Sequence, residues 1–149
     1  MFVAPQAGWR HGAVTDQHTK LDFAPQLQWL VDERYPQAEL VRVTLDNLNT
    51  HKPASLYEAL APEEARRIIK KLEFHYTPKH GSWLNMAEIA LSVLQRQCLA
   101  RRSPDQQTLK QEIAAWEQPR NSEKATIDWR FSISDAREKL KRLYPSKST

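Results

Sequence analysis

Two acidic residues stand where a carboxylate can bind a metal ion. Asp46 follows the apolar run Leu40–Leu45, and Glu88 falls in the first turn of a predicted helix. Mg²⁺ prefers hard oxygen ligands and usually takes one or two carboxylates together with substrate phosphates. Both residues also have a structural interpretation, because Asp46 could close a turn and Glu88 could form a capping box with Asn85. The pair is a candidate metal site, with turn formation and capping as alternatives.

Neighbouring polar residues could assist this chemistry, and other classes of site are excluded. His51, His75 and His80 lie near the two acids in sequence and could donate to a phosphate or orient a water. Lys79 with His80 could hold a phosphate, and Trp83 could stack on a base or pack its loop onto the next helix. The histidines lack zinc-binding spacing, and one cysteine cannot build a zinc finger. Three glycines leave no P-loop and no dinucleotide fingerprint.

The elements that must position these residues alternate between strands and helices. Thr19 and Asp22 have the spacing of a capping box, and Pro25 would lie in the first turn of that helix or kink it. The first half of the chain is predicted to form the strand Trp9–Thr15, a helix from Thr19 to Tyr35, the strand Leu40–Leu45, the helices Pro53–Leu60 and Pro62–Lys71, and the strand Leu72–Tyr76. The second half is predicted to form a helix over about Asn85–Ala100, a helix opened by Ser103 and Pro104 and ending near Glu117, a polar loop Pro119–Lys124, a short strand or extended arm Ile127–Phe131, and a last helix capped by Ser134 and ended by Pro145. This order indicates an α/β fold with a mostly parallel sheet.

Composition restricts the class of protein further. A chain of 149 residues with 40% hydrophobic residues and five tryptophans is expected to fold as one domain. No apolar stretch is long enough for a membrane span, and the N-terminus does not have the pattern of a signal peptide. The single Cys98 suits a reducing cytoplasm and is predicted to pack in the core. The net charge of +4 permits a nucleic-acid partner without requiring one.

Two motifs around the acids resemble the C-terminal part of the DDE transposases of bacterial insertion sequences, in the Tc/mariner superfamily. The first motif is Leu45–His51 and the second is Tyr76–Glu88. The similarity extends over nearly the whole chain through Arg96–Leu99, Ala115 and Trp116, Trp129–Phe131 and Asp135–Leu140.

This resemblance implies a ribonuclease-H-like fold, with a mixed sheet flanked by helices, that cleaves and joins DNA by metal-dependent phosphoryl transfer. By position, Asp46 matches the family's second catalytic acid and Glu88 its third, so both would hold Mg²⁺ or Mn²⁺ in a two-metal site. The partners would be the terminal repeats of the element and a target DNA. The protein would work in the bacterial cytoplasm, at the nucleoid when bound to DNA. The residues expected to contact DNA are Asn47, His51, Lys79, His80, Trp83 and Asn85.

The family's first acid is not found in its usual context. Asp16 ends the predicted strand Trp9–Thr15, and Asp22 is predicted as a helix cap. The chain is therefore expected to be a single partial domain over residues 1–149, without the first strands, with a core at about 9–102 and a C-terminal helical extension at about 103–145. Little or no transposition is expected from this chain alone.

Other polypeptides could complete such a domain, and two other interpretations stay open. The missing N-terminal half or another transposase copy would supply the first acid. Alternatively, the chain is a non-catalytic DNA-binding or inhibitory remnant that pairs with full-length transposase. In the third interpretation it is a structural α/β domain in which Asp46 and Glu88 only close a turn and cap a helix.

Overall fold

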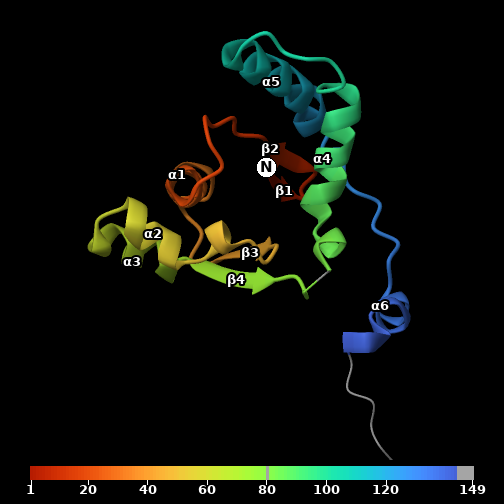
Figure 1. Cartoon of the computed structure of the whole chain (residues 1–149), viewed down its shortest axis with the longest axis horizontal. Helices are drawn as coiled ribbons and strands as arrows, with labels where there is room; N and C mark the ends of the chain where they lie inside the picture. The colour runs from red at the N-terminus through yellow and green to blue at the C-terminus, as the bar shows by residue number, and fades with distance from the viewer. Residues whose placement is uncertain (80, 144–149) are drawn as a thin grey trace, which may run out of the picture.

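The computed structural model describes residues 1–79 and 81–143, which form a mixed α/β architecture with six α-helices and two small sheets (Figure 1). Strands β1 (Phe2–Ala4) and β2 (Trp9–His11) form an antiparallel hairpin. Strands β3 (Val41–Leu45) and β4 (Leu72–Tyr76) pair in parallel, with Val41 opposite Leu72. The α/β class predicted from the sequence is confirmed, although one of the two strand pairs is antiparallel.

The first strand of the prediction is shorter than expected. The sequence pattern predicted a strand over Trp9–Thr15, whereas β2 ends at His11. The reason lies at Gly12, whose backbone N–H donates to the carboxylate of Glu117 and not to a neighbouring strand. A side chain replaces the strand partner at this point, and the strand ladder stops.

Helix α1 (Lys20–Trp29) begins as the sequence predicted. The Thr19 hydroxyl accepts from the Asp22 N–H, and the Asp22 carboxylate accepts from the Thr19 N–H at 2.9 Å, which completes a capping box. Pro25 lies in the helix interior and not in the first turn. The wider helical turn η1 (Leu30–Arg34) continues the helix to Tyr35.

Helices α1, α2 (Ala54–Ala59) and α3 (Pro62–Lys70) cover one face of the β3–β4 pair. The other face of the pair is polar, with Arg42 and His75 both bonded to Glu73. The buried residues of this core are Ala24, Leu27, Leu30, Val31, Val43, Leu45, Leu56, Ala65, Ile68 and Leu72. Burying several aliphatic side chains together is the main source of stability available to this part of the chain.

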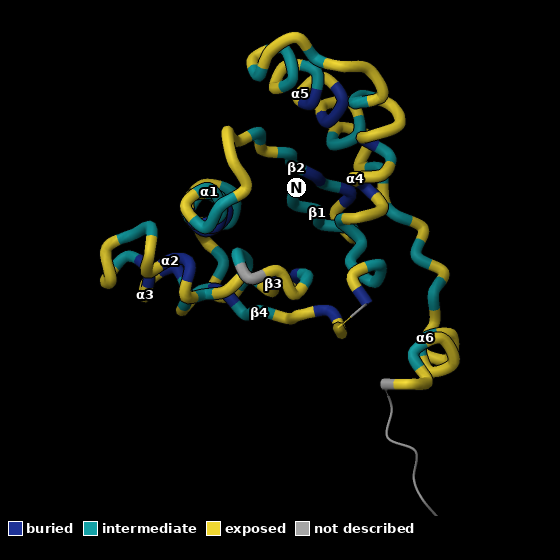
Figure 2. The backbone as a smooth tube through the Cα atoms, in the orientation of Figure 1, coloured by how far each residue is buried: buried dark blue, intermediate teal, exposed yellow. Residues whose placement is uncertain are grey.

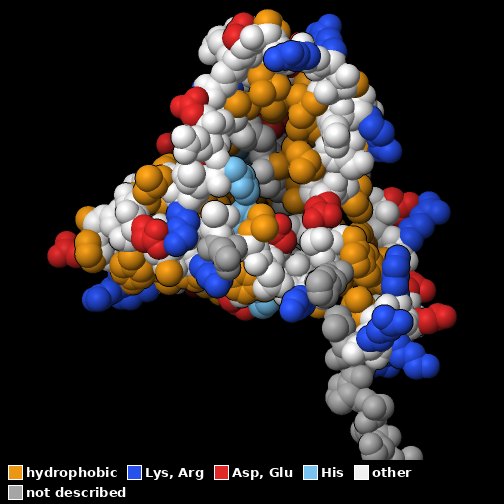
Figure 3. Space-filling view, in the orientation of Figure 1, with side chains coloured by type: hydrophobic (Ala, Val, Ile, Leu, Met, Phe, Trp, Pro, Cys, Tyr) orange, Lys and Arg blue, Asp and Glu red, His pale blue; other side chains and the backbone are white. Residues whose placement is uncertain are grey.

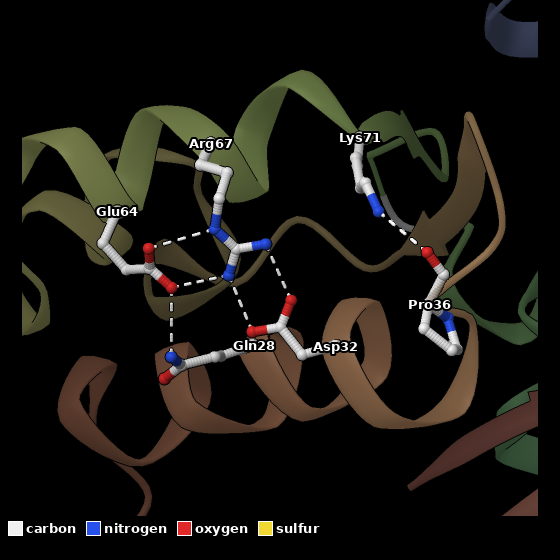
Figure 4. A network of polar contacts seen from close by, with 6 residues as sticks. All are labelled: Gln28, Asp32, Pro36, Glu64, Arg67 and Lys71. Atoms are coloured by element: carbon white, nitrogen blue, oxygen red, sulfur yellow. Dashed lines mark hydrogen bonds and ion pairs between the residues drawn. The ribbon is translucent and has the colours of Figure 1, made fainter.

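A charged network ties α3 to α1 and η1 on the surface of this core (Figure 4). Arg67 donates to both carboxylate oxygens of Asp32 at 2.7 Å and also pairs with Glu64. Gln28 donates to the same Glu64 at 3.2 Å, and Lys71 donates to the backbone carbonyl of Pro36. The two-point contact fixes the direction of the guanidinium and hence the seating of α3 on α1.

The second half of the chain is helical. Its elements are η3 (Ser82–Leu84), α4 (Met86–Gln97), α5 (Gln106–Ser122), α6 (Ile133–Lys139) and the short turn η4 (Lys141–Leu143). Buried positions gather on α1, on α2 and on the inner side of α5 (Figure 2). No described helix combines the length and apolar character needed to cross a membrane.

Helix α5 differs most from its prediction. Its N-cap is Asp105, whereas the sequence predicts a cap at Ser103 followed by Pro104. The helix also continues through Pro119 to Ser122, where the sequence predicts a polar loop. Ile113, Trp116 and Glu117 are buried, and these tertiary contacts outweigh the local cost of the proline.

The end of the chain also departs from its prediction in detail. Ser132, not Ser134, caps α6, because Asp135 completes a capping box at the required spacing from Ser132. The predicted stop at Pro145 lies outside the described residues. Residues 125–131 form no regular element, so the short strand predicted as one alternative is absent and the extended arm is the alternative that agrees with the structure.

Candidate functional site

A cavity of about 950 Å³ opens between the N-terminal hairpin, α1, β3 and the start of α4. Figure 3 shows this face of the molecule hollowed, with hydrophobic side chains along the walls and histidine side chains at one side. Asp46 lines the cavity, and so do Asn85, Met86 and Ala87 from the start of α4. The end of the buried strand and the start of the helix, which the sequence singled out, therefore border the same space.

Asp46 is held by groups from the turn that follows β3. The imidazole Nδ1 of His51 lies 2.5 Å from Asp46 Oδ1, with the ring N–H donating to the carboxylate. The Leu48 N–H donates to the same oxygen at 3.4 Å. The other oxygen, Oδ2, has no hydrogen-bond partner among the described residues, and the side chain is 26% exposed. One lone-pair-bearing oxygen of Asp46 is thus free for a ligand.

His51 is fixed on three sides. Its ring packs against Phe23 with centroids 4.8 Å apart and lies 6.1 Å from the ring of His18. Its backbone carbonyl accepts from the Tyr76 hydroxyl at 2.9 Å. Burial raises the pKa of the Tyr76 phenol, which keeps that donor protonated. The contacts hold the imidazole against Asp46.

Glu88 lies in the first turn of α4, as predicted, and its side chain is exposed. The capping box proposed for Asn85 and Glu88 does not form: the Asn85 carboxamide accepts from the Ala87 N–H at 3.1 Å, and within residues 1–79 and 81–143 no bond returns from Glu88. Asn85 alone satisfies the helix start, which leaves the Glu88 carboxylate uncommitted. Glu88 is not among the residues that line the cavity.

The other sequence candidates have mostly structural contacts. The Asn47 carboxamide donates to the Thr77 carbonyl and so joins the ends of β3 and β4. Trp83 packs edge-on against Phe131, and the Lys139 ammonium lies 4.5 Å from the centre of its ring. Lys79 is exposed. His80, also expected to contact DNA, lies outside the described residues.

His18 and Asp22 also line the cavity, and sequence reasoning did not assign them to the site. Asp22 caps α1, and its hydrogen bonds from Thr19 lower the pKa of its carboxyl. No local pattern marks His18, because the folding of α1 against the turn after β3 brings it near His51. Only the tertiary structure reveals this neighbour.

Asp46 can serve as one ligand of a divalent metal ion, but the described part of the chain holds no complete set of ligands. The carboxylate of Asp46 is a hard oxygen donor with one free oxygen, which suits Mg²⁺ or Mn²⁺. However, no group of three His, Cys, Asp or Glu residues within 1–79 and 81–143 could hold an ion. Further ligands would have to come from a rearranged Glu88, from a substrate phosphate or from groups outside the described residues.

Comparison with known proteins gives the family. The model of the DDE superfamily endonucleases matches residues 1–110. This chain belongs to the DDE superfamily endonucleases. No similar protein was found among the curated proteins, and no similar structure among the solved structures.

Membership in the DDE superfamily endonucleases gives DNA as the substrate class and points to cleavage of the transposase kind. The family generally uses divalent metal ions, which agrees with the chemistry of the Asp46 carboxylate. The match contains β3, β4 and α4, and therefore both acids, whereas most of α5 and all of α6 lie beyond it.

Proposed function

We propose that this chain is the metal-binding part of an insertion-sequence transposase of the Tc/mariner superfamily, with a ribonuclease-H-like fold in which Asp46 and Glu88 are two of the catalytic acids. The family match over residues 1–110 carries the proposal. It is supported by Asp46, which lines a large cavity at the end of a parallel strand and whose Oδ2 has no hydrogen-bond partner among the described residues. Ligand chemistry concentrates at this end of strands in α/β sheets.

In this proposal the chain's own residues orient the acids and attract the DNA. His51 positions the Asp46 carboxylate through the 2.5 Å contact with Oδ1, so that Oδ2 stays available for a ligand. Glu88, free of any capping bond to Asn85, swings toward the cavity from the first turn of α4. Asp46 and Glu88 would hold Mg²⁺ or Mn²⁺, which would supply the activation of a nucleophile and the stabilisation of a leaving oxygen in phosphoryl transfer on DNA. Because the described residues hold no group of three metal-ligating side chains, we expect them to cleave DNA poorly by themselves.

A second candidate function is a DNA-binding or inhibitory module that pairs with a complete transposase. The observation that favours it is the absence, within the described residues, of three acids or histidines arranged around an ion. The net charge of +4 suits DNA binding in either case. In the first function a metal ion binds at Asp46, whereas in the second function it does not.

Titration of the ¹⁵N-labelled chain with Mn²⁺ in the presence of a short DNA duplex tests the site. Mn²⁺ broadens the NMR signals of nuclei near it, so the amides around Asp46 and in the first turn of α4 should broaden first. Asp46→Asn and Glu88→Gln should each abolish this selective broadening. Glu138→Gln, a change of an exposed acid on α6, is the matched control and should leave it unchanged.

The outcomes separate the interpretations. Selective broadening that Asp46→Asn removes supports the metal site. DNA binding without any selective broadening would favour the inhibitory module. If broadening persisted unchanged in both Asp46→Asn and Glu88→Gln, the assignment of the two acids would be wrong. Nicking of supercoiled DNA in Mn²⁺ then measures activity, and any nicking by this chain should disappear in Asp46→Asn.

A further inference from the structure

The segment that follows α5 leaves the body of the molecule. It lies beyond residues 1–110, which match the family model, and consists of an extended stretch followed by α6. The Ala125 carbonyl accepts from the Arg10 guanidinium, and within the described residues no backbone hydrogen bond joins residues 126–131 to another element. Figure 1 shows α6 standing apart from the other helices. Side chains therefore hold this C-terminal strap, residues 125–139, against the rest of the chain.

Three aromatic rings and one cation join the C-terminal strap to the turn η3. The Phe131 ring meets the Trp83 indole edge-on, with centroids 4.9 Å apart and an interplanar angle of 89°. Trp129 in turn packs edge-on against Phe131, with centroids 5.9 Å apart. The Lys139 ammonium of α6 lies 4.5 Å from the centre of the indole ring. Edge-to-face aromatic pairs and a cation over an indole are both favourable, so Trp83 anchors the strap.

Backbone hydrogen bonds connect Trp83 to the first turn of α4. The Asn85 N–H donates to the Ser82 carbonyl at 2.7 Å, and this bond spans Trp83. The Asn85 carbonyl accepts from the Glu88 N–H at 3.0 Å, and the Asn85 carboxamide accepts from the Ala87 N–H at 3.1 Å. The turn η3 and the helix start consequently form one hydrogen-bonded unit, and a shift of Trp83 also moves the backbone of Glu88.

The hydrophobic core gives the first turn of α4 little support. The buried residues of this helix are Ala90 and Leu94, and both lie beyond its first turn. Met86 and Ala87 are only half-buried, and Glu88 is exposed. The contacts of Trp83 with the C-terminal strap therefore determine where the helix begins and how Glu88 is directed.

We propose that Trp83 is a positioning residue for Glu88, and that the C-terminal strap holds Trp83 in place through Phe131 and Lys139. The role rests on the proposed function, in which Glu88 binds a metal ion. Trp83 acts on Glu88 through the backbone of the helix start and touches neither the metal ion nor the DNA.

Hydrogen exchange measured by NMR tests the strap without any metal ion. In the full chain, Phe131→Leu should speed exchange of the Asn85 and Glu88 amides by roughly twofold to tenfold, because one edge-to-face contact is lost. Lys139→Gln removes the cation over the indole and should speed exchange by roughly twofold to fivefold. Arg137→Gln is the matched control, since it removes an equal charge from an exposed position of the same helix and should leave both rates unchanged.

Titration with Mn²⁺ and a short DNA duplex tests the positioning itself. The Mn²⁺ concentration that half-broadens the amides in the first turn of α4 should rise by roughly tenfold or more in Phe131→Leu and in Trp83→Leu. Trp83→Phe keeps an aromatic ring at this position and should restore most of the affinity, and Arg137→Gln should leave the concentration unchanged. Phe131 belongs to neither buried core, so its variant should fold, and the melting temperature of each metal-free variant checks this.

Three results would overturn the role of Trp83. In the first, neither strap variant speeds exchange at the helix start beyond the Arg137→Gln control, so the strap does not hold it. In the second, exchange is faster but the required Mn²⁺ concentration is unchanged, so Trp83 only stabilises the turn. In the third, Trp83→Leu weakens binding of the duplex and Phe131→Leu does not, so the indole contacts DNA directly.

Failure of the proposed function gives a different result. Mn²⁺ would then broaden no amide of the unsubstituted chain selectively, and the positioning of a metal ligand would be refuted together with the metal site. The exchange rates of the Phe131→Leu and Lys139→Gln variants would still show whether the C-terminal strap holds the start of α4, because they are measured without metal.

Discussion

Asn121→Ala should release the N-terminal hairpin from α5. The Asn121 side chain bonds both backbone groups of Arg10: its Oδ1 accepts from the Arg10 N–H at 2.9 Å, and its Nδ2 donates to the Arg10 carbonyl at 2.8 Å. The two residues are 111 positions apart in sequence. One side chain thus takes the place of a neighbouring strand along β2 and fixes the hairpin that forms one wall of the cavity.

The expected cost follows from these two bonds. Each net hydrogen bond contributes about 0.5–1.5 kcal/mol, so losing both costs about 1–3 kcal/mol. Alanine favours a helix over asparagine by roughly 0.5 kcal/mol, which offsets part of the loss. A net loss of about 1.5 kcal/mol lowers the melting temperature of a chain of this size by roughly 3–6 °C.

Urea unfolding followed by circular dichroism measures the loss, and hydrogen exchange of the Arg10 amide shows where it occurs. Gln118→Ala is the matched control, since Gln118 is an exposed residue of the same helix and its replacement should change stability by less than about 0.5 kcal/mol. If Asn121→Ala were as stable as Gln118→Ala, or if exchange at Arg10 did not accelerate, the clamp would not hold the hairpin.

Three further predictions concern the core, the charged network and the cysteine. Leu56→Ala should cost about 2–5 kcal/mol in urea unfolding, because Leu56 is fully buried, whereas Leu48→Ala, at a 45% exposed position, should cost far less; equal costs would contradict the assigned core. The Arg67 guanidinium lowers the pKa of the Asp32 carboxyl. Ionised Asp32 therefore stabilises the fold above its ordinary pKa of about 4, and this stability is lost as the pH falls through the lowered pKa. The acid-induced drop in melting temperature should be smaller in Arg67→Ala, and an identical drop would refute the coupling. Burial raises the pKa of the Cys98 thiol, with Glu112 adding to the effect, so iodoacetamide should alkylate it more slowly at neutral pH than it alkylates a free cysteine, and an equal rate would show that the thiol is not shielded.

Elements with complete local signals could be predicted from the sequence. The strand Leu72–Tyr76 has the predicted bounds, because its apolar residues alternate and Pro78 follows closely. The start of α1 is correct for a similar reason: Thr19 and Asp22 are close enough in sequence for their reciprocal bonds to form without any tertiary contact. Asp46 at the end of β3 follows from the apolar run before it.

Elements that depend on distant contacts could not be predicted in this way. Pro119 is a strong local signal for a helix end, yet α5 continues through it because Trp116 and Glu117 are buried and Asn121 clamps the hairpin. These partners come from the other end of the chain. The proximity of His18 to His51 has the same origin and leaves no pattern in the sequence.

Neighbouring residues hold the carboxylate of Asp46 in position, whereas they do not hold that of Glu88. The strand and the His51 contact fix the Asp46 carboxylate at the cavity. Glu88 follows directly after the segment Asn85–Ala87 that lines the cavity, but its exposed side chain is long and carries the same charge as Asp46. Like charges repel, so two carboxylates converge where a cation lies between them. The described contacts give Asp46 a histidine neighbour but do not bring Glu88 to it. Loss of Mn²⁺-induced broadening in both Asp46→Asn and Glu88→Gln therefore distinguishes a metal site from a turn and a helix start.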